Sequence, residues 1–148
     1  MKFAAAAILS IAVFALPAAA QDAVKPAGAT LGVADTAAAT RAASEFLALL
    51  DAGKFAESWT ASAVLLRGAV PQDQWSGALA SMRAALGELS SRKLVSSTFT
   101  RSLPGAPAGD YLVLAYQTEF AKKAGTVETV TPMREPDGSW KVSGYFVK

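Results

Sequence analysis

The spacing of apolar residues predicts three helices in the first half of the chain. Between Asp35 and Asp51, apolar residues recur every three or four positions, as on one face of an α-helix. A second helix is expected over residues 54–67, where Gly68 ends the pattern. Pro71, a residue favoured at the first helical position, opens the third and most regular pattern. Its apolar stripe consists of Trp75, Leu79, Met82 and Leu86.

After Glu88 the pattern changes to an alternation with a period of two, which is typical of strands. It predicts four strands, over residues 90–102, 110–123, 126–135 and 139–148. Pro132 in the third strand indicates an edge position or a bulge, because proline cannot donate to the ladder. Helices followed by closely spaced strands predict an α+β domain. We expect the N-terminal helices to pack on a curved four-stranded antiparallel sheet, giving a cone-shaped domain.

The first 20 residues have the features of a secretory signal peptide. Lys2 precedes an apolar run over residues 3–16, and the small residues Ala18–Ala20 follow. The run is too short for a membrane-spanning helix, and Pro17 interrupts it. We predict cleavage after Ala20, no stable membrane anchor after cleavage, and a periplasmic or secreted location.

The remaining chain is predicted to be a single domain. Residues 21–34 are small and polar and predict a flexible mature N-terminus, followed by one α+β domain over residues 35–148. With Lys2 removed, 13 of the 14 cationic residues remain against 12 acidic ones, so the net charge is about +1. A net charge this small is not the excess of positive charge that is typical of a nucleic-acid-binding protein.

Two residue types that carry much of protein chemistry are missing. The sequence contains no Cys and no His, so it offers no disulfide, no imidazole base and neither of the commonest zinc ligands. It also contains no glycine-rich phosphate-binding motif. The sequence therefore predicts no metal site and no cofactor.

Two carboxylates on the predicted sheet are candidates for acid–base chemistry. Glu119 and Glu128 lie on strands that flank a turn at Gly125. If they met on one face of the sheet, one could have a raised pKa and act as a general base. The alternative is that each is solvated, as most charged side chains are.

Two arginines are candidates for binding an anion. Arg83 lies beside the apolar stripe of the third helix, and Arg92 opens the first strand. Two guanidinium groups at such a junction could clamp a carboxylate or a phosphate. Alternatively, they could bond to a helix C-terminal carbonyl or to Glu88 as part of the fold.

The aromatic residues fit either a ligand pocket or an ordinary core. The set comprises Trp59, Trp75, Tyr111, Tyr116, Trp140, Tyr145 and Phe146. Strict alternation along the last strand places Tyr145 on the face opposite Trp140 and Phe146. If the domain leaves that face uncovered, we expect a homodimer contact there.

Several motifs resemble a known family in their order and spacing. They are Trp75, Arg83, Leu86-Gly87 and Ser91-Arg92, followed by LPGAPAGDY, TEFAKK, VETVTPM and DGSWKVSGYFVK. Over roughly residues 42–148 the chain resembles the exported bacterial family called domain of unknown function four thousand and nineteen. The resemblance implies a cystatin-like or nuclear-transport-factor-two-like α+β fold, and it implies no particular activity.

The first functional hypothesis is a non-enzymatic binding or protein-interaction module of the periplasm. Its partner would be a second copy, another periplasmic protein or a small apolar ligand. One alternative is an enzyme of the cone-shaped fold class that uses Glu119 or Glu128 as a base on a small hydrophobic molecule. Another is a structural dimerisation domain. A cone filled with side chains, with an exposed apolar sheet face, would favour assembly with another protein.

Overall fold

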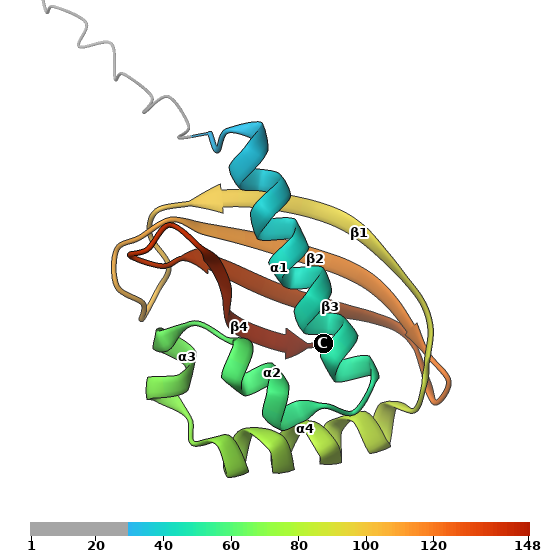
Figure 1. The fold of residues 1–148 in the computed structure, drawn as a ribbon. Helices are drawn as coiled ribbons and strands as arrows, with labels where there is room; N and C mark the ends of the chain where they lie inside the picture. Colours follow the sequence, from blue (N-terminus) through green and yellow to red (C-terminus); the bar gives the residue numbers. More distant parts are fainter. Residues whose placement is uncertain (1–29) are drawn as a thin grey trace, which may run out of the picture.

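The computed structural model describes residues 30–148, and these form the predicted α+β fold (Figure 1). The helices are α1 (Val33–Asp51), α2 (Phe55–Ala61), α3 (Val64–Ala69) and α4 (Gln72–Leu86). The strands are β1 (Leu89–Thr100), β2 (Tyr111–Phe120), β3 (Lys123–Arg134) and β4 (Trp140–Val147). The predicted signal peptide lies outside the described residues. So does most of the predicted flexible N-terminus, whose last two residues belong to α1.

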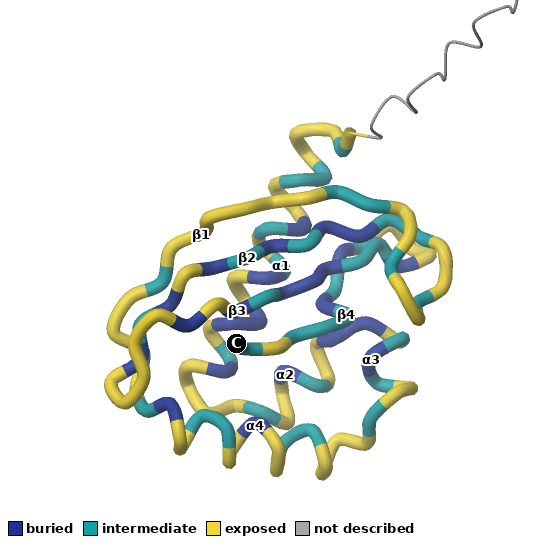
Figure 2. Tube along the Cα trace, turned by 180° about the vertical axis from the view of Figure 1, so that it is seen from behind, coloured by how far each residue is buried: buried dark blue, intermediate teal, exposed yellow. Residues whose placement is uncertain are grey.

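The four strands form one antiparallel sheet in the order β1-β2-β3-β4. Helix α1 crosses one face of this curved sheet, and α2, α3 and α4 lie beyond the β4 side (Figure 1). We call the covered side the helix face. Seen from behind, the strands lie in front and no described helix crosses them (Figure 2). We call this second side the open face.

The core lies between α1 and the helix face of the sheet. Helix α1 buries two small residues, Ala39 and Ala43, and three large ones. The large ones are Phe46, Leu47 and Leu50. The small residues let the helix approach the sheet closely, and the large ones pack against Leu112, Leu114 and Val130. Within residues 30–148, none of the helices is long and apolar enough to cross a membrane.

The predicted second helix is wrong in one respect, because residues 54–67 form parts of two short helices. The chain becomes extended at Ser62 and Ala63, and Ala63 donates its N–H to the Val142 carbonyl at 2.8 Å. The new helix then starts with its Val64 N–H bonded to the Glu135 carboxylate at 2.9 Å. Contacts with the sheet thus interrupt a continuous helical pattern, and Gly68 lies inside α3 instead of ending it.

A β-bulge between β3 and β4 changes what the sequence alternation predicts. Pro132 lies in the interior strand β3, so the edge alternative is wrong and the bulge alternative is confirmed. The pairing shifts there, since Thr131 faces Gly144 whereas Pro132 faces Val142, and Ser143 is left unpaired. This extra residue reverses the alternation in β4.

The bulge places Tyr145 on the helix face, not on the open face. Tyr145 pairs with buried Val130, and its ring packs edge-on against Phe46 at 5.7 Å between ring centres. Phe146 takes the opposite side and is 49% exposed. The prediction that Tyr145 lies opposite Trp140 is therefore wrong, because both lie on the helix face, whereas Tyr145 does lie opposite Phe146. Tyr145 is thus not on the uncovered face where a dimer contact was expected.

Candidate functional site

Glu128 is the centre of the most concentrated group of polar contacts in the described chain. It lies on β3, points to the helix face and has no exposed surface. Arg92 donates to it from Nε at 2.6 Å and from Nη2 at 3.2 Å, and Arg83 donates from Nη2 at 3.3 Å. The Tyr145 hydroxyl donates at 2.6 Å and the Thr118 hydroxyl at 2.7 Å. Five hydrogen bonds therefore satisfy both carboxylate oxygens.

Asp51 supplies a second carboxylate to the same arginines. It accepts hydrogen bonds from Arg92 Nη1 at 2.6 Å, from Arg92 Nη2 at 2.9 Å and from Arg83 Nη1 at 3.0 Å. Two guanidinium groups thus face two carboxylates, and their formal charges cancel. A buried ion pair needs this kind of compensation, because an unpaired charge in the interior is very costly.

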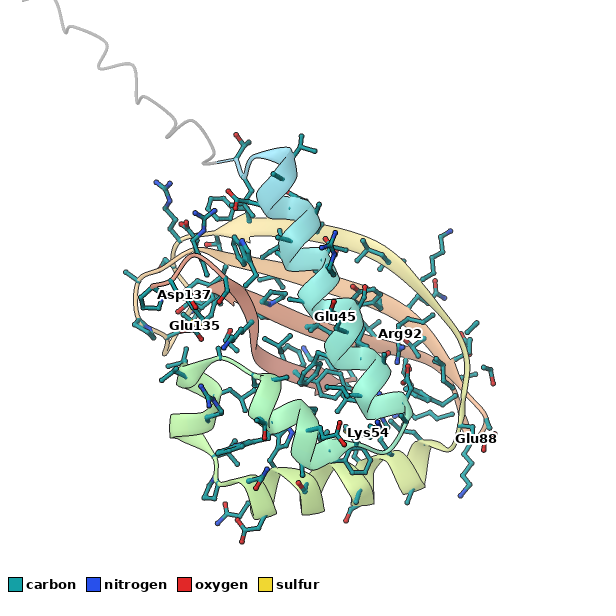
Figure 3. All side chains as sticks on the ribbon, in the orientation of Figure 1. Glu45, Lys54, Glu88, Arg92, Glu135 and Asp137 are labelled. Atoms are coloured by element: carbon teal, nitrogen blue, oxygen red, sulfur yellow. The ribbon has the colours of Figure 1, made fainter. Side chains whose placement is uncertain are left out.

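The residues of this group come from six elements of the fold. They are Asp51 of α1, Arg83 of α4, Arg92 of β1, Thr118 of β2, Glu128 of β3 and Tyr145 of β4. We call this set the Glu128 cluster. Arg92 extends from β1 toward the C-terminal half of α1 (Figure 3). The cluster therefore links two helices to all four strands.

The cluster controls how its own members ionise. Burial lowers the pKa of Arg92, but hydrogen bonds to Asp51 and Glu128 outweigh this effect and raise it above the usual arginine value. Burial alone would raise the pKa of Asp51. The combined effect of Arg92 and Arg83 is larger and opposite, so the pKa of Asp51 lies below 3.8. Burial and the neighbouring Glu128 raise the pKa of Tyr145 above its ordinary value. At neutral pH Asp51 and Arg92 are therefore charged and Tyr145 is neutral.

Two of the candidate residues from the sequence lie outside these contacts. Tyr116 is buried on the helix face of β2, and its hydroxyl has no hydrogen-bond partner among the described residues. Burial raises the pKa of Tyr116. Glu119 lies on the other face of β2 and accepts a hydrogen bond from the Gly125 N–H at 2.9 Å. Glu119 and Glu128 therefore do not meet on one face.

The other four candidates, Arg83, Arg92, Glu128 and Tyr145, are brought together by the fold. The arginines form the anticipated clamp, but the carboxylates that they hold belong to this chain. Sequence reasoning missed Asp51 and Thr118. A signal for Asp51 was present, because an acidic residue at the last position of a helix opposes the helix dipole and needs a cation nearby.

Two cavities of the described chain lie beside the cluster. One, about 560 Å³, lies between α1, α2 and β4 over Phe46, Leu49 and Trp140. A second, about 520 Å³, is bordered by Asp51 and Arg83. Glu128 lines neither of them. Action as a base would require Glu128 to leave its five donors.

The described residues offer no ready metal ligands. No group of three or more Asp or Glu side chains within residues 30–148 is placed to hold a metal ion. The carboxylates of Asp51 and Glu128 already bind arginine.

The structure is a small α+β domain in which a buried, charge-balanced cluster joins two helices to an open sheet. The chain belongs to the family described as protein of unknown function (DUF4019), whose family model matches residues 42–145. The match includes every residue of the Glu128 cluster. Comparison with curated proteins found no match, and comparison with solved structures found none either.

Asp51→Asn gives a pH-dependent test of the cluster. Because the folded pKa of Asp51 is lowered, its carboxylate stabilises the fold above the unfolded pKa of 3.8 and loses this effect as the pH falls through the folded value. We expect wild type to exceed Asp51→Asn in free energy of unfolding at about pH 7, and the difference to shrink as the pH falls below 3.8. Urea unfolding of both proteins across this range measures it. A difference that stays constant with pH would contradict the role given to the Asp51 charge.

Proposed function

We propose that this domain is an exported, non-enzymatic interaction module. The observation that carries the proposal is the state of Glu128, the fully buried carboxylate of the described chain. All of its hydrogen-bonding capacity is used within the fold, by Arg83, Arg92, Tyr145 and Thr118. A general base needs a lone pair within reach of its substrate, and Glu128 has none to offer.

The open face of the sheet supports action through the protein surface. One row across it consists of Ser96, Ala115, Thr129 and Phe146. The next row contains Val127, which is 38% exposed, beside Gln117. The centre of this uncovered face is uncharged and exposes two large apolar side chains, Phe146 and Val127, which supports an interaction surface.

We propose that the open face binds a second copy of the chain. A four-stranded sheet with strands as long as β2, at 10 residues, covers roughly 600 Å², estimated from ~3.3 Å per residue and ~4.8 Å between strands. This area approaches the ~800 Å² that each partner buries in an interface of standard size. Both charge signs border the face, through Lys93 and Glu119, so a two-fold arrangement can bring opposite charges together.

Self-association can be measured with one substitution at the centre of the open face. Thr129→Arg places a charge in the proposed interface twice, so we expect sedimentation equilibrium to show a dimer for wild type and dimerisation weakened by about 100-fold for the variant. The matched control is Ser81→Arg, on the exposed side of α4, which should dimerise like wild type. A monomeric wild type, or equal dimerisation of Thr129→Arg, would contradict the proposal.

Export is the second part of the proposal, and it is supported by the pattern of residues 1–20. We expect the protein recovered from a bacterial periplasm to have Gln21 as its first residue. Intact-mass spectrometry of that fraction measures the cleavage site. A product that retains Met1 and remains with the cytoplasmic fraction would contradict export.

A further inference from the structure

The C-terminal half of β4 is a free edge of the sheet with unused backbone groups. Val127 and Lys148 exchange two backbone hydrogen bonds at 3.0 Å each. Such pairs alternate with non-hydrogen-bonded pairs in an antiparallel ladder. The N–H and C=O groups of Tyr145 and Val147 must therefore point away from β3, where no fifth strand follows.

The residues of this part of the edge carry none of the sequence features that usually prevent pairing. Earlier in the strand, the Val142 carbonyl already accepts the Ala63 N–H. From Val142 to Val147 the sequence is VSGYFV, with no proline and no charged residue. Natural sheets commonly guard their edges with charges, prolines or bulges. Here the bulge residue Ser143 comes before the free groups, not among them.

An apolar groove runs along the same edge. It has a volume of about 260 Å³ and lies between β4 and α4. Trp75, Leu79 and Met82 line it from the helix, and Tyr145, Phe146 and Val147 line it from the strand. Because α4 forms the opposite wall, an incoming segment has to lie between two elements. This suits one extended segment and not the edge of another folded sheet.

One cation lies near the end of the groove beyond Met82. Lys122 donates its Nζ to the Ala84 carbonyl at 3.1 Å, two residues beyond Met82. Within residues 30–148, Lys122 has no acidic side chain within ion-pair distance. A negative charge on the bound segment would complement this end.

We propose that this groove binds an extended peptide segment of another protein by strand addition to β4. The segment pairs its backbone with Tyr145 and Val147, places a large apolar side chain between Trp75 and Met82, and carries a carboxylate near Lys122. Backbone pairing provides affinity in this mode of recognition, and the side-chain pocket provides specificity. The inference rests on the proposed function as an interaction module and gives it a second surface and a class of partner.

A phage-displayed library of random peptides is the probe for this test. We expect enriched peptides with a large apolar residue followed by an acidic one. Val147→Pro should weaken the best peptide by about tenfold or more, because it removes the outward N–H and leaves the ladder to β3 intact. The matched control Val147→Thr keeps the N–H and the branched side chain and should bind like wild type.

Hydrogen exchange identifies the backbone amides of β4 that pair with the bound peptide. On peptide binding, we expect protection to rise at Tyr145 and Val147, while Phe146, which already pairs with Thr129, changes little. If Val147→Pro fails to fold, Ala78→Arg on the rim of the groove is the second variant, and it should also weaken binding about tenfold. Failure to enrich any peptide, full binding by the folded variants, or protection elsewhere would overturn the inference.

The dimer at the open face and the peptide site at the groove can be rejected independently of each other. Loss of peptide binding with self-association intact rejects the groove and leaves the open face. A monomeric wild type that binds peptide at the groove rejects the dimer and leaves the strand-addition site.

Discussion

The hydrogen bonds between Arg92 and Glu128 hold together parts of the chain that hydrophobic packing alone would leave less precisely placed. Arg92 comes from the edge strand β1, most of whose residues are exposed, and Glu128 comes from the interior strand β3. Arg92 also binds Asp51 at the end of α1, so the same guanidinium fixes the helix to the sheet. Arg83 brings in α4 through both carboxylates. The position of α4, and hence the groove along β4, depends on this set of contacts.

A buried ion pair rarely stabilises a fold more than well-packed apolar side chains would, but breaking one by removing a single partner is strongly destabilising. The Glu128 cluster meets the conditions for a stable arrangement, since its formal charges cancel and Glu128 accepts five hydrogen bonds. Its geometry is also directional, because guanidinium groups bind carboxylates in few orientations. Because the cluster occupies the interior, the surfaces that we propose for binding are the open face and the β4 edge.

Local patterns predicted most of the fold, because each element follows from its own residues. The stripe of α4 and the order of four antiparallel strands are examples. The errors arose where distant contacts override local preference. Ala63 leaves the helical pattern to bond with β4, and the bulge at Ser143 turns Tyr145 toward Glu128. For the site, the sequence indicated Arg83 and Arg92 as a pair, and Glu128 and Tyr145 as separate candidates. Strand register and helix position bring these residues together and add Asp51 and Thr118 to the cluster. The spacing of residues along the chain does not encode either of them.

The central claim is that Glu128 serves the structure through its charge. The most direct measurement is the free energy of unfolding of Glu128→Gln at neutral pH, compared with Glu45→Gln on the exposed side of α1. Glutamine keeps the size of the side chain but leaves the two arginines with an uncompensated buried charge. The account predicts a loss of about 3–5 kcal/mol for Glu128→Gln, the usual cost of removing one partner of a buried ion pair, and little change for the control. A Glu128→Gln protein as stable as wild type would contradict it.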